Sequence, residues 1–213
     1  GEIWPNKSVT VANTVAGPDD PSTMPTITAM AQRSATGVRF VAAPVRSRSA
    51  RRATAEALTT VAPAMAAAPD LVALVDLGRP LVGSESTRWI EMCEVVLLVH
   101  RQASASAAAE SVRLERLSEQ LEQLVGQTVV LAIIGDAPFD PGEIADHIDR
   151  SLPDVLADWV VLSEDPLAAA VLAGRTGVST KRLQRLPLMR SARTATDLLS
   201  TSIAPRITMG YPQ

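Results

Sequence analysis

Residues 71–80, LVALVDLGRP, form an apolar run that closes on Asp76 and Gly78. A continuous apolar run of this kind is typical of a strand that is covered on both faces of a parallel sheet. Sheets that bind nucleotides often end a buried strand on a carboxylate that faces a metal ion. The run therefore raises the question of whether the chain also contains the phosphate-binding loop that such a strand accompanies.

Six apolar runs of this type alternate with segments of helical length along the chain. The runs cover residues 8–16, 37–45, 71–77, 94–100, 128–135 and 157–163. The expected helices cover residues 23–35, 49–68, 86–93, 103–126 and 140–152. Such alternation predicts an α/β fold with a doubly wound, mostly parallel sheet of about six or seven strands and helices on both faces, in three layers.

Length and composition limit the function classes. The 213 residues suffice for one domain, expected over residues 1–205 with a tail at 206–213. The net charge of -3 gives no overall excess of basic residues of the kind that binds nucleic acid. The single cysteine excludes an internal disulfide framework and a cysteine-based zinc cluster. The chain has no apolar run of about 20 residues and no signal-peptide pattern at Gly1, so we expect a cytoplasmic protein.

Polar residues follow several of the runs, where an open parallel sheet binds its ligands. These residues are Asp19, Asp20, Asp76, Gly78, His100, Arg101, Gly135, Asp136, Glu164 and Asp165. Aspartates at such junctions also cap helices, and for Asp136 and Asp165 we favour capping over ligand binding. For Asp76 we favour a functional origin, because no helix start follows for about eight residues.

Other reactive side chains lack a catalytic or metal-binding pattern. His100 and His147 have no partner at metal-ligand spacing and are interpreted as surface or packing residues. No G-x-S-x-G motif surrounds any serine. Cys93 precedes an expected strand and is interpreted as buried and unreactive.

A basic cluster lies near the C-terminus, within an amphipathic stretch that Pro187 must kink or split. Its members are Lys181, Arg182, Arg185, Arg190 and Arg193. Such a stretch can contact a partner or an anionic membrane. We favour the alternative, in which the helix docks on the sheet and its arginines face water.

Residues 37–199 resemble actinobacterial relatives of the MinD/ParA group of P-loop ATPases, which position septa, chromosomes and pili. The matching segments, in the expected order, are GVRFVAAPV, LVALVDLGRP, CEVVLLVHRQASAS, IIGDAPFDPGEIADHI, LSEDPLAAAVLAG and RLQRLPLMRSAR. The resemblance implies a P-loop NTPase-like sheet. It also implies that Asp76 and Gly78 form the Walker B segment, with Asp76 as the metal residue if nucleotide binds. Asp136, Asp165 and Pro166 then lie near the nucleotide.

The phosphate-binding loop of that family is missing from the sequence. The chain contains no G-x-x-x-x-G-K-[ST] motif, and the nearest approach, GPDDPST at 17–23, has two aspartates and no lysine. Negative charges at that position would oppose a triphosphate. The first strand, loop and helix of the family are therefore absent, either because they were lost or because they lie upstream.

Three functions follow as expectations. The first is a degenerate domain without hydrolysis that regulates or scaffolds cell division, chromosome partitioning or pilus positioning through protein contacts. Its expected contact surfaces are the sheet edge, helix 104–125 and the basic cluster. The second is an ATPase whose phosphate loop lies upstream or on another chain. ATP and magnesium are expected as cofactors only if such a loop is supplied from outside this chain. The third, a receiver-like module, would use Asp19 and Asp20 but lacks a lysine after the fifth run.

The expected partners follow from the first function. A protein partner is expected, and a homodimer is one form that it could take. Sequence-specific binding to nucleic acid is not expected, and contact with a membrane surface is not favoured.

Overall fold

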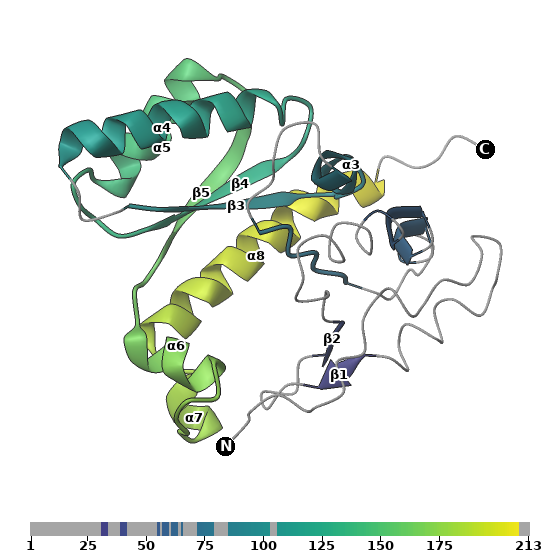
Figure 1. Cartoon of the computed structure of the whole chain (residues 1–213), viewed down its shortest axis with the longest axis vertical. Coiled ribbons are helices and arrows are strands. Elements are labelled where there is room, and N and C mark those ends of the chain that lie inside the picture. Colours follow the sequence, from purple (N-terminus) through teal and green to yellow (C-terminus); the bar gives the residue numbers. More distant parts are fainter. Residues whose placement is uncertain are drawn as a thin grey trace. The chain divides into compact units, whose positions relative to one another are not determined.

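The computed structural model describes part of the chain. The described residues are 31–33, 39–41, 55, 57–59, 61–63, 65, 72–78, 85–102 and 106–208. The chain divides into two compact units, residues 1–92 and 93–213, which we describe one at a time (Figure 1). The expectation of a single domain over residues 1–205 stays a prediction. The runs and aspartates expected before residue 31, including Asp19 and Asp20, lie outside the described residues.

The first unit contains a two-stranded antiparallel ladder and helical segments. Strand β1 (Gln32–Arg33) pairs with β2 (Arg39–Phe40), and α3 spans Glu85–Glu91. The described residues between 55 and 65 are helical and pack with α3 into a small core. Its buried members are Ala57, Leu58, Val61, Ala62 and Trp89. The expected helices at 49–68 and 86–93 are thus confirmed where they are described, whereas β1 replaces part of the helix expected at 23–35.

Residues 72–78 do not form the strand that their composition predicts. Val75 and Leu77 pack against the core of the first unit, while Val72 and Leu74 are each 89% exposed. Only one side of the segment is therefore covered. The prediction of a strand buried on both faces is wrong here, because the described residues provide no neighbouring strand for it.

The second unit contains a parallel sheet of three strands, in the order β3-β4-β5. The strands are β3 (Val96–Arg101), β4 (Val129–Ile134) and β5 (Leu156–Leu162). They confirm the runs expected at 94–100, 128–135 and 157–163. The central strand is the most apolar, and its residues from Val129 to Ile133 are 0% exposed. The described part of the chain is therefore α/β with a three-stranded parallel sheet. It does not include the sheet of six or seven strands.

Helices cover both faces of this sheet, as expected (Figure 1). On one face lie α4 (Ala107–Glu122) and α5 (Pro141–Ser151). On the other face lies α8 (Pro187–Thr208), whose Ala195 packs on Ala132 of β4 and Val160 of β5. Two short helices, α6 (Pro166–Leu172) and α7 (Thr180–Leu183), connect β5 to α8.

Local sequence signals explain where these helices begin and end. The leucines of α4 at positions 114, 117 and 121 are buried, which is the apolar stripe that its spacing predicts. Helix α5 begins with a capping box between Asp140 and Glu143, with proline at its first position. Pro187 starts α8 instead of bending a longer helix, so it splits the basic stretch. None of the described helices is long and apolar enough to cross a bilayer.

Candidate functional site

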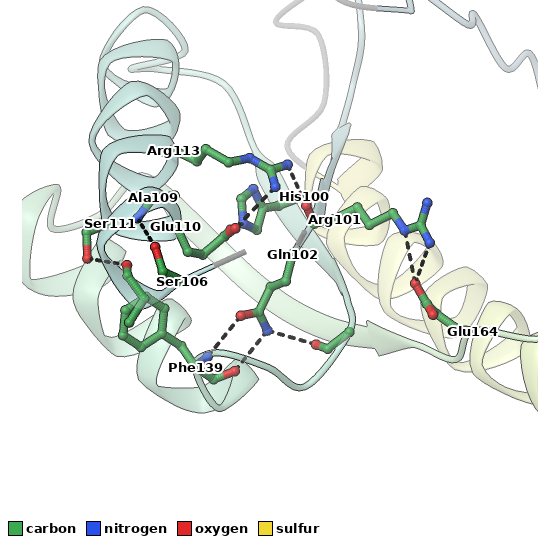
Figure 2. Close-up of polar contacts among 12 residues, drawn as sticks. His100, Arg101, Gln102, Ser106, Ala109, Glu110, Ser111, Arg113, Phe139 and Glu164 are labelled. Carbon is green, nitrogen blue, oxygen red and sulfur yellow. Dashed lines mark hydrogen bonds and ion pairs between the residues drawn. The ribbon is translucent and has the colours of Figure 1, made fainter. Parts of the chain in front are cut away.

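Polar side chains gather at the carboxyl end of the three-stranded sheet, where open α/β sheets bind their ligands (Figure 2). The side chains come from the end of β3, the first turns of α4 and the residues after β5, and the loop between β4 and α5 supplies backbone groups. The sequence predicted that these ends would meet. The geometry shows what the side chains do there.

A buried network joins β3 to α4. The Nε2 atom of His100 lies 2.8 Å from Oε1 of Glu110, and Nη1 of Arg113 lies 3.1 Å from Oε2 of the same carboxylate. His100 is 7% exposed and Glu110 is 0% exposed. Arg113 also donates to the carbonyl oxygen of Arg101 at 2.6 Å. A buried carboxylate needs such partners, because an unpaired charge in the interior is strongly unfavourable.

Burial lowers the pKa of His100 below its ordinary value of 6.5, and the hydrogen bond and charge of Glu110 oppose this only in part. The positive charge of Arg113 lowers the pKa of His100 further. His100 is therefore neutral near pH 7. Because a carboxylate only accepts hydrogen bonds, the proton of the neutral ring is assigned to Nε2, facing Glu110.

The lowered pKa of His100 predicts that the chain loses stability in mild acid. Below pH 6.5 the unfolded chain binds a proton that the folded chain does not, so the free energy of unfolding falls until the folded pKa is reached. One proton limits the slope to about 1.4 kcal/mol per pH unit. Urea titrations at steps between pH 7.5 and 5 measure it. A His100→Gln variant, which keeps a donor for Glu110, should show a smaller slope; an identical slope would contradict the prediction.

Gln102, directly after β3, links this strand to the loop between β4 and α5. Its amide donates to the carbonyl oxygens of Gly135 (2.9 Å) and Phe139 (2.8 Å) and accepts from the backbone nitrogen of Phe139 (3.1 Å). Gly135 has a φ of +90°, and a Cβ added there would lie 3.4 Å from Cβ of Gln102. Gln102 is 5% exposed, so the side chain is buried with its polar atoms satisfied.

The residues after β5 contribute an ion pair and a helix cap. Arg101 contacts Oε1 of Glu164 through Nε and Nη2, both at 2.9 Å, but the two side chains are 70% and 51% exposed. Such an exposed pair contributes roughly 0–1 kcal/mol. Asp165 caps α6 by accepting from the nitrogen of Ala168 at 2.9 Å, and Pro166 is the first residue of that helix. The capping interpretation of Asp165 is confirmed.

Of the other predicted aspartates, Asp136 takes no part in this cluster, and Asp76 belongs to the first unit. Asp136 is exposed in the loop after β4, and Asp140 caps α5 in its place, so capping by Asp136 is wrong. Asp76, in the first unit, is exposed and accepts a hydrogen bond from the nitrogen of Gly78 at 2.9 Å. Gly78 has a φ of +60°, so these two residues form a local turn.

The remaining predicted residues lie on the surface or at its margin. All five members of the basic cluster are exposed, on α7, just after it, or on α8. His147 is exposed on α5, in accordance with a surface role. Cys93 is half-buried; burial raises the pKa of its thiol, and the carboxylate of Glu94 raises it further, so the thiolate form is disfavoured.

Three residues of the site were not identified from the sequence: Gln102, Glu110 and Arg113. A signal for Glu110 was present, because it lies four residues before Leu114 and thus continues the buried stripe of α4. An acidic residue on an apolar stripe requires a buried partner. Gln102 and Arg113 carry no comparable signal, since their partners lie in distant or differently oriented segments.

The hydrogen bonds and ion pairs of this site join β3 to α4, to the loop after β4 and to the residues after β5. Most of the polar groups described above are bound to other protein groups, whereas Oδ2 of Asp165 is buried without a hydrogen-bond partner in the described part of the chain. Within the described ranges, no cluster of three or more histidine, cysteine or carboxylate side chains could hold a metal ion. Comparisons of the chain with protein-family profiles, with curated proteins and with solved structures find no match.

Proposed function

We propose that the chain is a degenerate MinD/ParA-like domain that acts through protein contacts and does not hydrolyse nucleotide. In this proposal it regulates or scaffolds cell division, chromosome partitioning or pilus positioning, and its sheet derives from the larger P-loop type. One observation carries the proposal: at the carboxyl end of β3, β4 and β5, the side chains of Arg101, Gln102 and Arg113, which could donate to phosphate, are already bound to acceptors within the protein (Figure 2).

A triphosphate site needs donors that are free to turn toward phosphate oxygens, chiefly backbone N–H groups, lysines and arginines. Here Arg113 is held by the carboxylate of Glu110 and by a backbone carbonyl. Arg101 pairs with Glu164, and the amide of Gln102 is fully used within the protein. Binding phosphate would require breaking these contacts, and the buried Glu110 would then repel it.

Calorimetric titration with magnesium-ATP tests this proposal directly. We expect no saturable binding up to about 1 mM nucleotide, which corresponds to less than roughly 4 kcal/mol of binding free energy. A variant, Asp76→Ala, provides the comparison, because Asp76 is the residue that the family resemblance assigns to the metal. Micromolar affinity that Asp76→Ala abolishes would overturn the proposal.

A second candidate is an ATPase whose phosphate loop lies upstream of this sequence or on another chain. The observation that favours this candidate is the outer edge of β3, the side of the strand that faces away from β4. Val96 and Gln102 donate their N–H groups toward β4, so the backbone groups of Leu97 and Val99 face the other way. No backbone partner for them occurs among the described residues, and Val99 is 51% exposed. Tight, magnesium-dependent binding in the same titration would support this candidate instead.

A further inference from the structure

A groove lies between α4 and α5, on the face of the sheet opposite α8. Its volume is about 420 Å³. Leu114 and Ile144, both buried, and the half-buried Phe139 supply its apolar surface. A groove of this size is large enough to hold a few side chains of a docked segment, and it also falls within the size range of small-ligand sites.

Acidic side chains line the same groove. Glu115 of α4 and Glu143 and Asp146 of α5 carry three carboxylates, against the single guanidinium of Arg150. None of the three carboxylates forms an ion pair within the described part of the chain. Arg150 instead directs its Nε toward the backbone oxygen of Asp146, at 3.0 Å. Glu143 also accepts the backbone N–H of Asp140 in the capping box of α5, whereas Glu115 and Asp146 leave the groove with negative charge beside apolar surface.

The opposite charge is concentrated elsewhere in the same unit. Residues 175–193 contain six basic residues and no acidic residue. Lys181, Arg182 and Arg185 are exposed on α7 and the turn that follows it, and no ion pair engages them within the described residues. In Figure 1, α7 lies at the end of this unit remote from α4 and α5. The basic segment therefore lies away from the groove of its own copy (Figure 1).

We propose that the basic segment 181–185 of one copy of this chain docks in the acidic groove between α4 and α5 of a second copy. The guanidinium groups pair with Glu115 and Asp146, and the alkyl stems of the arginines cover Leu114 and Phe139. The two surfaces differ, so the contact is head-to-tail, and it extends to chains of copies unless the rotation closes a ring. The inference names a partner for the protein-contact role proposed above and rests on that role.

Sedimentation of the whole chain tests the contact. The wild-type chain should self-associate with rising concentration at about 0.01 M ionic strength, where charges act over about 30 Å, and dissociate near 1 M, where they act over about 3 Å. Two charge-reversed variants should each bind themselves at least about tenfold more weakly. One is Glu115→Lys with Asp146→Lys. The other is Arg182→Glu with Arg185→Glu.

Mixing the two variants gives the decisive measurement, because the reversed groove of one matches the reversed segment of the other. The mixture should associate more strongly than either variant alone. A matched control, Glu119→Lys with Asp149→Lys, makes the same charge change on the same helices at positions that do not line the groove. It should associate as the wild-type chain does. Circular dichroism verifies that every variant is folded.

Three outcomes would overturn the inference. The first is a wild-type chain that stays monomeric at about 1 mM and low salt. The second is self-association that the groove variant leaves intact. The third is a groove that binds an unrelated arginine-rich peptide while the chain itself remains monomeric. Sedimentation is read without nucleotide, so failure here is distinguishable from failure of the proposed function, which calorimetry with magnesium-ATP decides.

Discussion

Replacing Glu110 with alanine should lower the free energy of unfolding by about 3 kcal/mol. Glu110 is completely buried and holds both His100 and Arg113. Its removal leaves the Nε2–H of a buried imidazole without its acceptor and releases a guanidinium from its carboxylate. The space of the lost side chain adds a cavity beneath α4. Urea-induced unfolding, followed by circular dichroism, measures the change.

The matched control is Glu119→Ala, an exposed residue of the same helix with the same change in charge and helix propensity. We expect it to alter stability by less than about 0.5 kcal/mol. Glu110→Gln retains an acceptor for His100 and should fall between the two. A loss below about 1 kcal/mol for Glu110→Ala would mean that the buried network contributes little to the fold.

Replacing Gln102 with alanine should cost about 2 kcal/mol and loosen the loop between β4 and α5. The substitution removes all three hydrogen bonds that tie β3 to Gly135 and Phe139. Hydrogen exchange offers a local measurement, because the amide of Phe139 donates to Gln102 and should exchange faster in the variant.

Gln120→Ala is the control, since Gln120 is exposed on α4 and lies outside the site. It should leave the exchange of Phe139 unchanged. Slow exchange of Phe139 in Gln102→Ala would show that the loop is held by other contacts.

The elements predicted best are those whose signal is local and continuous. The run at 128–135 contains the strand β4, which is completely buried from Val129 to Ile133 because it lies between two neighbouring strands and two helical layers. The leucine spacing of α4 predicted its buried stripe. Pro187 marked a helix boundary, since proline lacks the N–H that an interior position needs.

The wrong predictions concern features that depend on tertiary contacts rather than on local sequence. The run at 71–77 has the composition of a strand covered on both faces, but composition does not reveal whether a neighbouring strand is present. Asp136 and Asp140 lie in one loop, and only the proline and Glu143 after Asp140 identify the true cap. The site itself depends on pairs far apart in sequence, such as Gln102 with Phe139, which no periodicity signals.

The outer edge of β3 has a further consequence for handling the protein. Among the described residues no strand pairs with this edge, and Val99 is exposed on it. Such an edge is a template for unwanted pairing between molecules, and so for aggregation during concentration or refolding. Arg113 already donates a hydrogen bond to the carbonyl oxygen of Arg101 at one end of that edge, so fewer backbone groups of β3 are available for pairing with another molecule. A lysine in place of Val99 would place a charge in the middle of this edge and should improve solubility.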